Sequence, residues 1–251
     1  MMPTIILAEL LVLWLLSRRL SQNLYITAFL LTKSRPTAIG FLSFLFFPGT
    51  VIHELAHLFT AEILGVRTSG LTLVPEGLEE KNLPAGKAGV RTGSVAIAQS
   101  DPIRRAIIGI APVFVGLGTL GLLSYFLPNL WAQARADAAQ NVLFSSPSLY
   151  YVLITIYSLF AVSNTMFSSP EDMEGFWPVV IVISLVMGAA YMAGIRLNLT
   201  ASTSASITMF LQSAAINIGY VAALNIGLFA LSTLLIRGVE KITHRTLVRS
   251  Q

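Results

Sequence analysis

The sequence predicts an all-α membrane protein, a bundle of about six transmembrane helices with a short two-stranded β element. Of its 251 residues, 55% are hydrophobic and only 11% are charged, whereas an ordinary soluble domain has about 25% charged residues. The apolar residues gather in runs of about 20, the length at which a helix crosses the hydrocarbon core of a bilayer. The basic residues lie between these runs and form no stripe, so the composition excludes a nucleic-acid-binding module as well as a disordered chain or a coiled coil.

The chain opens with an apolar run at residues 3–17. We expect a membrane span here rather than a signal peptide, because no basic segment precedes the run and no small-residue cleavage site stands out. Residues 17–35 follow with four basic side chains around a shorter apolar stretch. This segment is either an interfacial helix or an extension of the first span.

Five later runs predict the remaining spans. They cover residues 37–65, 103–126, 149–168, 175–194 and 207–236. The third span begins at Asp101 and Pro102, an N-cap followed by proline in the first turn. Within this span, Gly109 and Gly116 are seven residues apart, so they share one helical face and permit close helix packing.

Two short strands are expected between the second and third spans, because residues 66–75 and 89–98 are rich in Val, Thr, Leu and Ile. The 66–100 loop with the start of the third span also holds six basic residues, and the tail after the sixth span holds four. Four spans separate these two groups, so we expect both on one side of the membrane, the cytoplasmic side. The basic residues of the N-terminal segment disagree with this assignment if the first span is complete.

The second span contains His53, Glu54 and His57 in the pattern H-E-x-x-H. Four residues advance an α-helix by slightly more than one turn, so the two histidines stack on one face and can share a metal ion. Glu54 flanks that face and can reach a water molecule on the metal as a general base. The alternative is ordinary packing or a polar seam, but a carboxylate near the bilayer interior costs about 2.5–3.5 kcal/mol and needs a partner. A bound cation explains the three residues together.

A catalytic zinc site usually needs a third protein ligand. The chain has no cysteine, and the remaining histidine, His244, lies in the basic tail, where we expect it to be solvated. Glu62 lies well around the helix from the metal face, while Glu9 in the first span is possible. The end of the fourth span offers a better candidate, because Pro170 ends or kinks the helix and leaves Asp172 free to point into the bundle.

These residues resemble the two motifs of the site-2 proteases, zinc metalloproteases that cut peptide bonds inside the membrane. Their first motif is H-E-x-x-H on a transmembrane helix. Their second motif has an asparagine, a proline six residues later and a metal-binding aspartate eight residues later, and Asn164, Pro170 and Asp172 keep that spacing. Phe167 and Met173 stand where the family usually has proline and glycine.

The resemblance implies an intramembrane zinc protease whose substrate is a transmembrane or membrane-proximal peptide within the lipid bilayer. The implied zinc ligands are two histidines and a carboxylate: His53, His57 and Asp172. Glu171 and Glu174 are close competitors for the carboxylate position. Glu54 would act as the general base, and Asn164 would bind the substrate backbone or the developing oxyanion, unless it only forms a hydrogen bond between helices.

We expect three parts in the chain. Residues 1–36 form an N-terminal span and interfacial linker, residues 37–175 the metalloprotease core, and residues 176–251 the C-terminal spans and basic tail. The expected location is the cell membrane of a prokaryote, with the 66–100 loop and the C-terminus in the cytoplasm.

Two other functions remain as alternatives. An inactive pseudoprotease would bind membrane segments and keep the metal for structure, but a structural site needs no general base such as Glu54. A metal carrier would use polar residues of the sixth span, such as Asn225, as a conduction path. Hydrogen bonds between helices explain Asn225 equally well.

Overall fold

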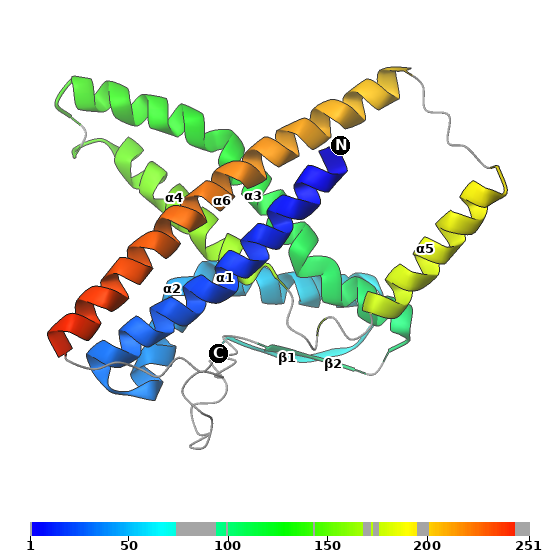
Figure 1. The fold of residues 1–251 in the computed structure, drawn as a ribbon, viewed down its shortest axis with the longest axis horizontal. Coiled ribbons are helices and arrows are strands. Elements are labelled where there is room, and N and C mark those ends of the chain that lie inside the picture. The colour runs from blue at the N-terminus through cyan, green and yellow to red at the C-terminus, as the bar shows by residue number, and fades with distance from the viewer. Residues whose placement is uncertain are drawn as a thin grey trace.

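The structure, a computed structural model, describes residues 2–73, 94–98, 100–142, 144–167, 172, 176–194 and 201–243. These residues form six α-helices and one two-stranded antiparallel sheet (Figure 1), which confirms the number of helices and the β element expected from the sequence. In chain order the elements are α1 (Met2–Thr32), α2 (Arg35–Ile63), β1 (Thr68–Thr72), β2 (Ser94–Ile97), α3 (Pro102–Ala139), α4 (Pro147–Thr165), α5 (Phe176–Met192) and α6 (Ala201–Thr243).

Three of the helices begin at a capping residue and have proline at the first or second helical position. The side chain of Asp101 accepts hydrogen bonds from the main-chain N–H groups of Ile103 and Arg104, at 3.1 and 3.0 Å, where α3 begins. Ser34 and Ser146 cap α2 and α4 in the same way. The cap satisfies N–H groups that have no partner in the first turn, and proline suits that turn because its missing N–H would be unpaired there. The cap expected at Asp101 is therefore confirmed.

Three helices, α1, α3 and α6, are longer than the apolar runs that predict them, and α6 has 43 residues. α1 continues through the basic segment, so residues 17–32 extend the first helix rather than form a separate one, and it ends where Lys33 adopts a φ of +57°. α3 has 38 residues and ends just before Asn141, whose φ is +59°. This left-handed conformation commonly follows the last helical residue and stops the helix.

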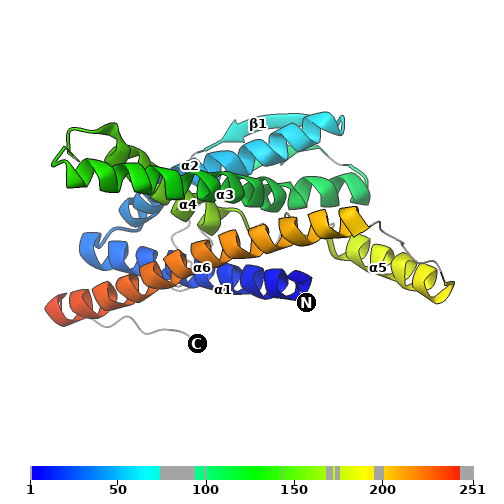
Figure 2. The same ribbon diagram turned by 90° about the horizontal axis from the view of Figure 1, so that it is seen from above.

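The helices form two layers with the core between them. α1 and α6 lie side by side in one layer, and α2, α3 and α4 form the other (Figure 2). Buried apolar side chains fill the space between the layers, among them Leu13 of α1, Leu120 of α3, Val162 of α4 and Val221 of α6. α5 lies outside both layers.

α2 and α4 pack closely and run in the same direction. Pro48 inside α2 has no N–H, which leaves the carbonyl of Phe44 without its helical partner. The hydroxyl of Tyr157 on α4 donates to this carbonyl at 3.3 Å. Two residues further along α2 and three further along α4, the rings of Phe46 and Phe160 stack with their centroids 5.5 Å apart. The contacts advance together along the two helices, so the helices are parallel.

α1 and α6 are also parallel. A carboxylate oxygen of Glu9 lies beside Gly219, and further along both helices the amide of Asn23 donates to the hydroxyls of Ser232 and Thr233, each at 3.2 Å. Since α1 leads directly into α2, the end of α6 lies at the opposite end of the bundle from the α2–α3 connection. The basic residues predicted these two regions on the same side of a membrane; the helix packing defines ends of the bundle and not membrane sides, so this stays a prediction. The tail after residue 243 lies outside the described residues.

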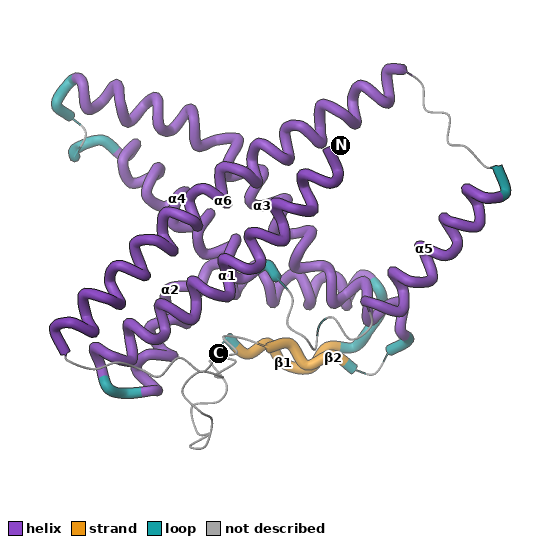
Figure 3. The backbone as a smooth tube through the Cα atoms, viewed as in Figure 1, coloured by secondary structure: helices purple, strands orange, loops and turns teal. Residues whose placement is uncertain are grey.

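The two strands form a small sheet between α2 and α3, beside the helical bundle (Figure 3). Thr68 lies opposite Ile97, and Thr72 lies opposite Ser94, with an irregularity in the register around Gly70. The φ of Gly70 is +75°, a backbone conformation that glycine adopts without strain. Both strands expected from the sequence are confirmed over Thr68–Thr72 and Ser94–Ile97, while residues 74–75 and 89–93 of the expected strands lie outside the described residues.

Four helices are long and apolar enough to cross a membrane: α2, α3, α4 and the Leu211–Val239 part of α6. The sequence predicted about six such spans. α5 is shorter, with 17 residues, and α1 carries Glu9, Arg18 and Arg19. Large apolar side chains cover much of the outer surface of the described helices, including Phe44 and Ile63, which are 79% and 84% exposed.

Candidate metal centre

His53 and His57 lie on one face of α2, one turn apart, as their spacing predicts. Their Nε2 atoms are 3.2 Å apart, and the two ring planes are nearly perpendicular, at 80°. The side chain of His53 is 13% exposed and that of His57 is 5% exposed. Both rings are therefore enclosed by the bundle and turn the same nitrogen toward the same point.

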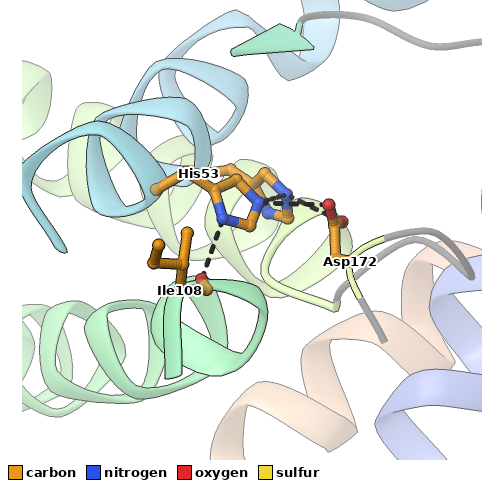
Figure 4. A network of polar contacts seen from close by, with 4 residues as sticks. His53, Ile108 and Asp172 are labelled. Atoms are coloured by element: carbon orange, nitrogen blue, oxygen red, sulfur yellow. Dashed lines mark hydrogen bonds and ion pairs between the residues drawn. The ribbon is translucent and has the colours of Figure 1, made fainter. Parts of the chain in front are cut away.

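Asp172 brings a carboxylate to that point from beyond the end of α4 (Figure 4). Its Oδ1 lies 3.5 Å from Nε2 of His57, and its Oδ2 lies 3.7 Å from Nε2 of His53. Within the described part of the chain, these three side chains form the one group that could hold a metal ion, with all ligand atoms within 4.8 Å of one another. The structure thus brings together the three residues that the motifs suggested as ligands.

The other candidate ligands do not belong to this group. Glu62 is exposed on α2, and Glu9 lies beside Gly219 at the contact between α1 and α6. Glu171, Glu174 and His244 lie outside the described residues.

The spacing of the three ligands fits a small ion with tetrahedral coordination. With metal–ligand bonds of about 2.0–2.2 Å, two ligand atoms at the tetrahedral angle are about 3.3–3.6 Å apart. The separations in the structure are 3.2, 3.5 and 3.7 Å. Two imidazoles and one carboxylate would occupy three corners, which leaves the fourth corner for water or substrate, as in catalytic zinc sites.

The main-chain carbonyl of Ile108 on α3 fixes the orientation of His57. Nδ1 of His57 lies 2.9 Å from this oxygen, which can only accept, so Nδ1 carries the proton. In the neutral ring, Nε2 then presents a lone pair to Asp172 and His53. A lone pair that faces a carboxylate is repelled by it, so the group needs a cation or a proton between its members. The pattern of side chains gives no signal for Ile108, because every residue offers a carbonyl.

Gly109 follows Ile108 and allows Asp172 to approach α3. A β-carbon at position 109 would overlap the main-chain carbonyl oxygen of Asp172. The sequence predicted that Gly109 and Gly116 permit close helix packing. Gly116 lies against Met166, just after the end of α4. Gly109 lies against the main chain of Asp172, the residue that carries the carboxylate. α3 therefore positions two of the three candidate ligands.

Glu54, the expected general base, is 6% exposed. The bundle therefore encloses this side chain. In the sequence, Glu54 is the residue directly after His53, the first candidate ligand. Nδ1 of His53, in contrast to that of His57, has no hydrogen-bond partner among the described residues. Ligating imidazoles usually donate a hydrogen bond from the second nitrogen, which fixes the ring, so His57 is the better oriented of the two.

Asn164 lies in a hydrogen-bond network between α4 and α6. Its amide group donates to the carbonyl of Phe160 and to Oδ1 of Asn225, both at 2.8 Å. Asn225 is 1% exposed and donates in turn to the hydroxyl of Ser163 at 2.9 Å. Both N–H groups of Asn164 are used within the bundle, which favours the hydrogen-bond alternative over contact with an oxyanion. The same network accounts for a polar residue at Asn225 without a conduction path.

Neither a protein-family model, nor a curated protein, nor a solved structure matches the chain. The function is therefore argued from the site itself. The site offers three nitrogen and oxygen atoms that could hold a metal ion, and a buried carboxylate, Glu54, next in sequence to one of them.

Proposed function

We propose that the protein is an intramembrane zinc metallopeptidase, a divergent relative of the site-2 proteases, which hydrolyses peptide bonds of membrane-embedded or membrane-proximal substrates. One observation carries the proposal. Asp172 lies more than 100 residues after His53 and His57 in the sequence, and the ligand atoms of the three converge on one point within a bundle of apolar helices.

The apolar exterior supports a location within the membrane. Exposed side chains such as Phe44 and Ile63 would face hydrocarbon, whereas in water they would form large apolar patches. Away from the helix ends and from proline, the main-chain groups of a helix are paired within the helix, which is the condition for lipid exposure. A peptide substrate would then reach the cluster from the lipid or from the membrane surface.

Zinc suits the set of donors best. Imidazole nitrogens and a carboxylate oxygen at three corners of a tetrahedron are typical of catalytic zinc sites, whereas magnesium and calcium prefer six or more oxygen ligands. Bound zinc would supply a Lewis acid that polarises the scissile carbonyl and lowers the pKa of a coordinated water molecule.

The remaining steps belong to the residues of the chain. Ile108 holds the Nε2 lone pair of His57 toward the metal position, and Asp172 supplies negative charge that offsets the charge of the cation. Glu54 would accept the proton of the attacking water and deliver it to the leaving amine. A helical substrate hides its carbonyls in hydrogen bonds and must unwind before attack. The edge of β1 or β2 that faces away from the other strand would hold the extended segment by strand addition.

The test compares the wild-type protein with the Glu54→Gln variant. We expect about one zinc ion per chain in both purified proteins, because Glu54 is not a ligand in this scheme. Membranes from cells with the wild-type protein should contain peptide fragments that are absent with Glu54→Gln, since loss of a general base slows turnover by about 10²–10⁴-fold.

The same comparison separates the alternatives. A pseudoprotease would yield zinc in both proteins and identical membrane proteomes. A carrier would transport metal equally well with Glu54→Gln. Either result would overturn the proposed peptidase.

A further inference from the structure

The directions of the packed helices limit how the chain can cross a membrane. α2 and α4 run one way, and α1 and α6 run the other way, as their contacts above show. α3 runs against α4. Asp137, near the end of α3, accepts a hydrogen bond from Ser148 at the start of α4. Gly116, earlier in α3, lies against Met166, just after α4 ends.

α2 and α4 therefore run in one direction, and α3 and α6 run in the other. These four helices alternate in direction along the chain even when α5 is left out of the count. If α5 also crossed the membrane, α6 would have to run in the same direction as α4. It runs in the opposite direction, because it is parallel to α1 and α1 turns back into α2 at Lys33 and Ser34.

The dimensions of α5 agree with this result. Its 17 residues span about 26 Å, somewhat less than the hydrocarbon core of about 30 Å. Most of its described side chains are apolar and exposed, including Ile181, Leu185 and Met192. The helix lies outside the two layers (Figure 2), so it can lie along one leaflet, with both of its ends on one side.

The metal cluster lies near one end of this arrangement. His57 precedes the last residue of α2 by six positions (57 to 63), and Ile108 follows the first residue of α3 by six positions (102 to 108). Six residues correspond to about 9 Å of helix. Both distances place the cluster close to the α2–α3 connection.

We infer that α5 does not cross the membrane, so that the metal cluster serves substrates in the leaflet next to the α2–α3 connection while the C-terminal end of α6 faces the opposite side. The inference rests on the membrane location in the proposed function. It narrows the substrates to membrane segments whose scissile bond lies in that leaflet.

This topology changes which basic residues share a side. Lys33 and Arg35, between α1 and α2, share a side with Arg237 and Lys241 at the end of α6. Arg67, Arg104 and Arg105, at the α2–α3 connection, lie on the opposite side, so the basic residues are divided between the two sides and do not by themselves choose the cytoplasmic one.

Cysteine labelling tests the topology directly, because the chain contains no cysteine and each single substitution adds the sole thiol. Four exposed positions mark the relevant ends: Arg67 after α2, Phe144 between α3 and α4, Thr203 at the start of α6 and Lys241 at its end. Each is replaced by cysteine in the full-length protein. A membrane-impermeant maleimide is then applied to sealed membranes and to detergent-opened membranes, with the cysteine-free parent as the control.

We expect Arg67→Cys and Thr203→Cys to react from one side, and Phe144→Cys and Lys241→Cys to react from the other. Pairing of Thr203→Cys with Phe144→Cys, and of Lys241→Cys with Arg67→Cys, would show that α5 crosses and would overturn the inference. If that occurs while zinc content and Glu54-dependent cleavage are intact, the proposed peptidase stands. If the expected pairing is found without zinc or cleavage, the peptidase proposal fails and the topology stands. Labelling of all four sites in sealed membranes overturns both the topology and the membrane location.

Discussion

The main-chain carbonyl oxygen of Asp172 occupies the space that a β-carbon at Gly109 would need. Substitution Gly109→Ala should therefore displace the carboxylate while the two histidines stay in place. We expect zinc affinity to fall by about 10–100-fold, the usual loss when a residue that orients a ligand is replaced. Equilibrium competition with a zinc indicator measures this change, and the absorption spectrum of the cobalt-substituted protein reports the loss of a ligand.

The control for this variant is Gly118→Ala on the same helix. A β-carbon at Gly118 would meet no other part of the described chain within 4 Å, so zinc binding should be unchanged. Equal zinc affinity in the two variants would show that Asp172 does not depend on the glycine.

Asp172→Asn should weaken zinc binding more than Gly109→Ala does, because it removes the charged ligand itself. An amide in place of the carboxylate leaves two neutral imidazoles around a divalent cation. We expect a loss of more than about 100-fold in zinc affinity, measured by the same competition assay. Glu62→Gln is the matched control, since Glu62 is an exposed carboxylate on α2. If only Glu62→Gln lowers the affinity, the ligand set is wrong.

Asn225→Leu should lower stability without removing the metal. The variant leaves the buried donor of Asn164 without its acceptor, and it removes a donor from Ser163. An unsatisfied buried polar group costs about 1–3 kcal/mol, which should appear as a lower Tm in detergent. Gln212→Leu, at an exposed position of the same helix, should leave the Tm unchanged. Loss of cleavage at an unchanged Tm would instead assign the network to the reaction.

Ala96→Pro should impair cleavage while zinc stays bound. Ala96 lies in β2 opposite Ser69, and proline removes a main-chain N–H and disfavours a regular strand. Ala96→Val keeps the N–H and suits a strand, so it is the control. The readout is the amount of membrane-peptide fragments relative to zinc content. Unchanged turnover in the proline variant would rule out strand addition at this sheet.

Much of the fold follows from local signals in the sequence. Apolar runs gave the six helices, and the Asp101–Pro102 pair marked the start of α3 because a cap acts within one turn. The His53–His57 pair was predictable for the same reason, since one helical turn determines its geometry. Asp172 was suggested by Pro170 at the end of the fourth span and by motif spacing, and neither signal encodes its distance from the histidines.

The remainder depends on contacts between distant segments. The parallel packing of α1 and α6 depends on Asn23 meeting Ser232, which no local pattern reveals. The carbonyl of Ile108 and the partner of Gly109 are main-chain features of the tertiary structure, so side-chain identity does not encode them. The sequence placed the C-terminal region by counting four spans between the 66–100 loop and the tail. Such a count assumes that every apolar run crosses the membrane, and it gives no information on how α6 packs.

The two layers differ in their origin along the chain. All three candidate ligands lie within one uninterrupted stretch, residues 53–172, while the facing layer is assembled from the two terminal regions. Remodelling α1 or α6 therefore alters what surrounds the cluster and leaves its chemistry intact. In the proposed peptidase, substrate selection and catalysis can therefore change independently. Replacing α1 and α6 by helices of a related protein would change which substrates reach the cluster without changing its ligands.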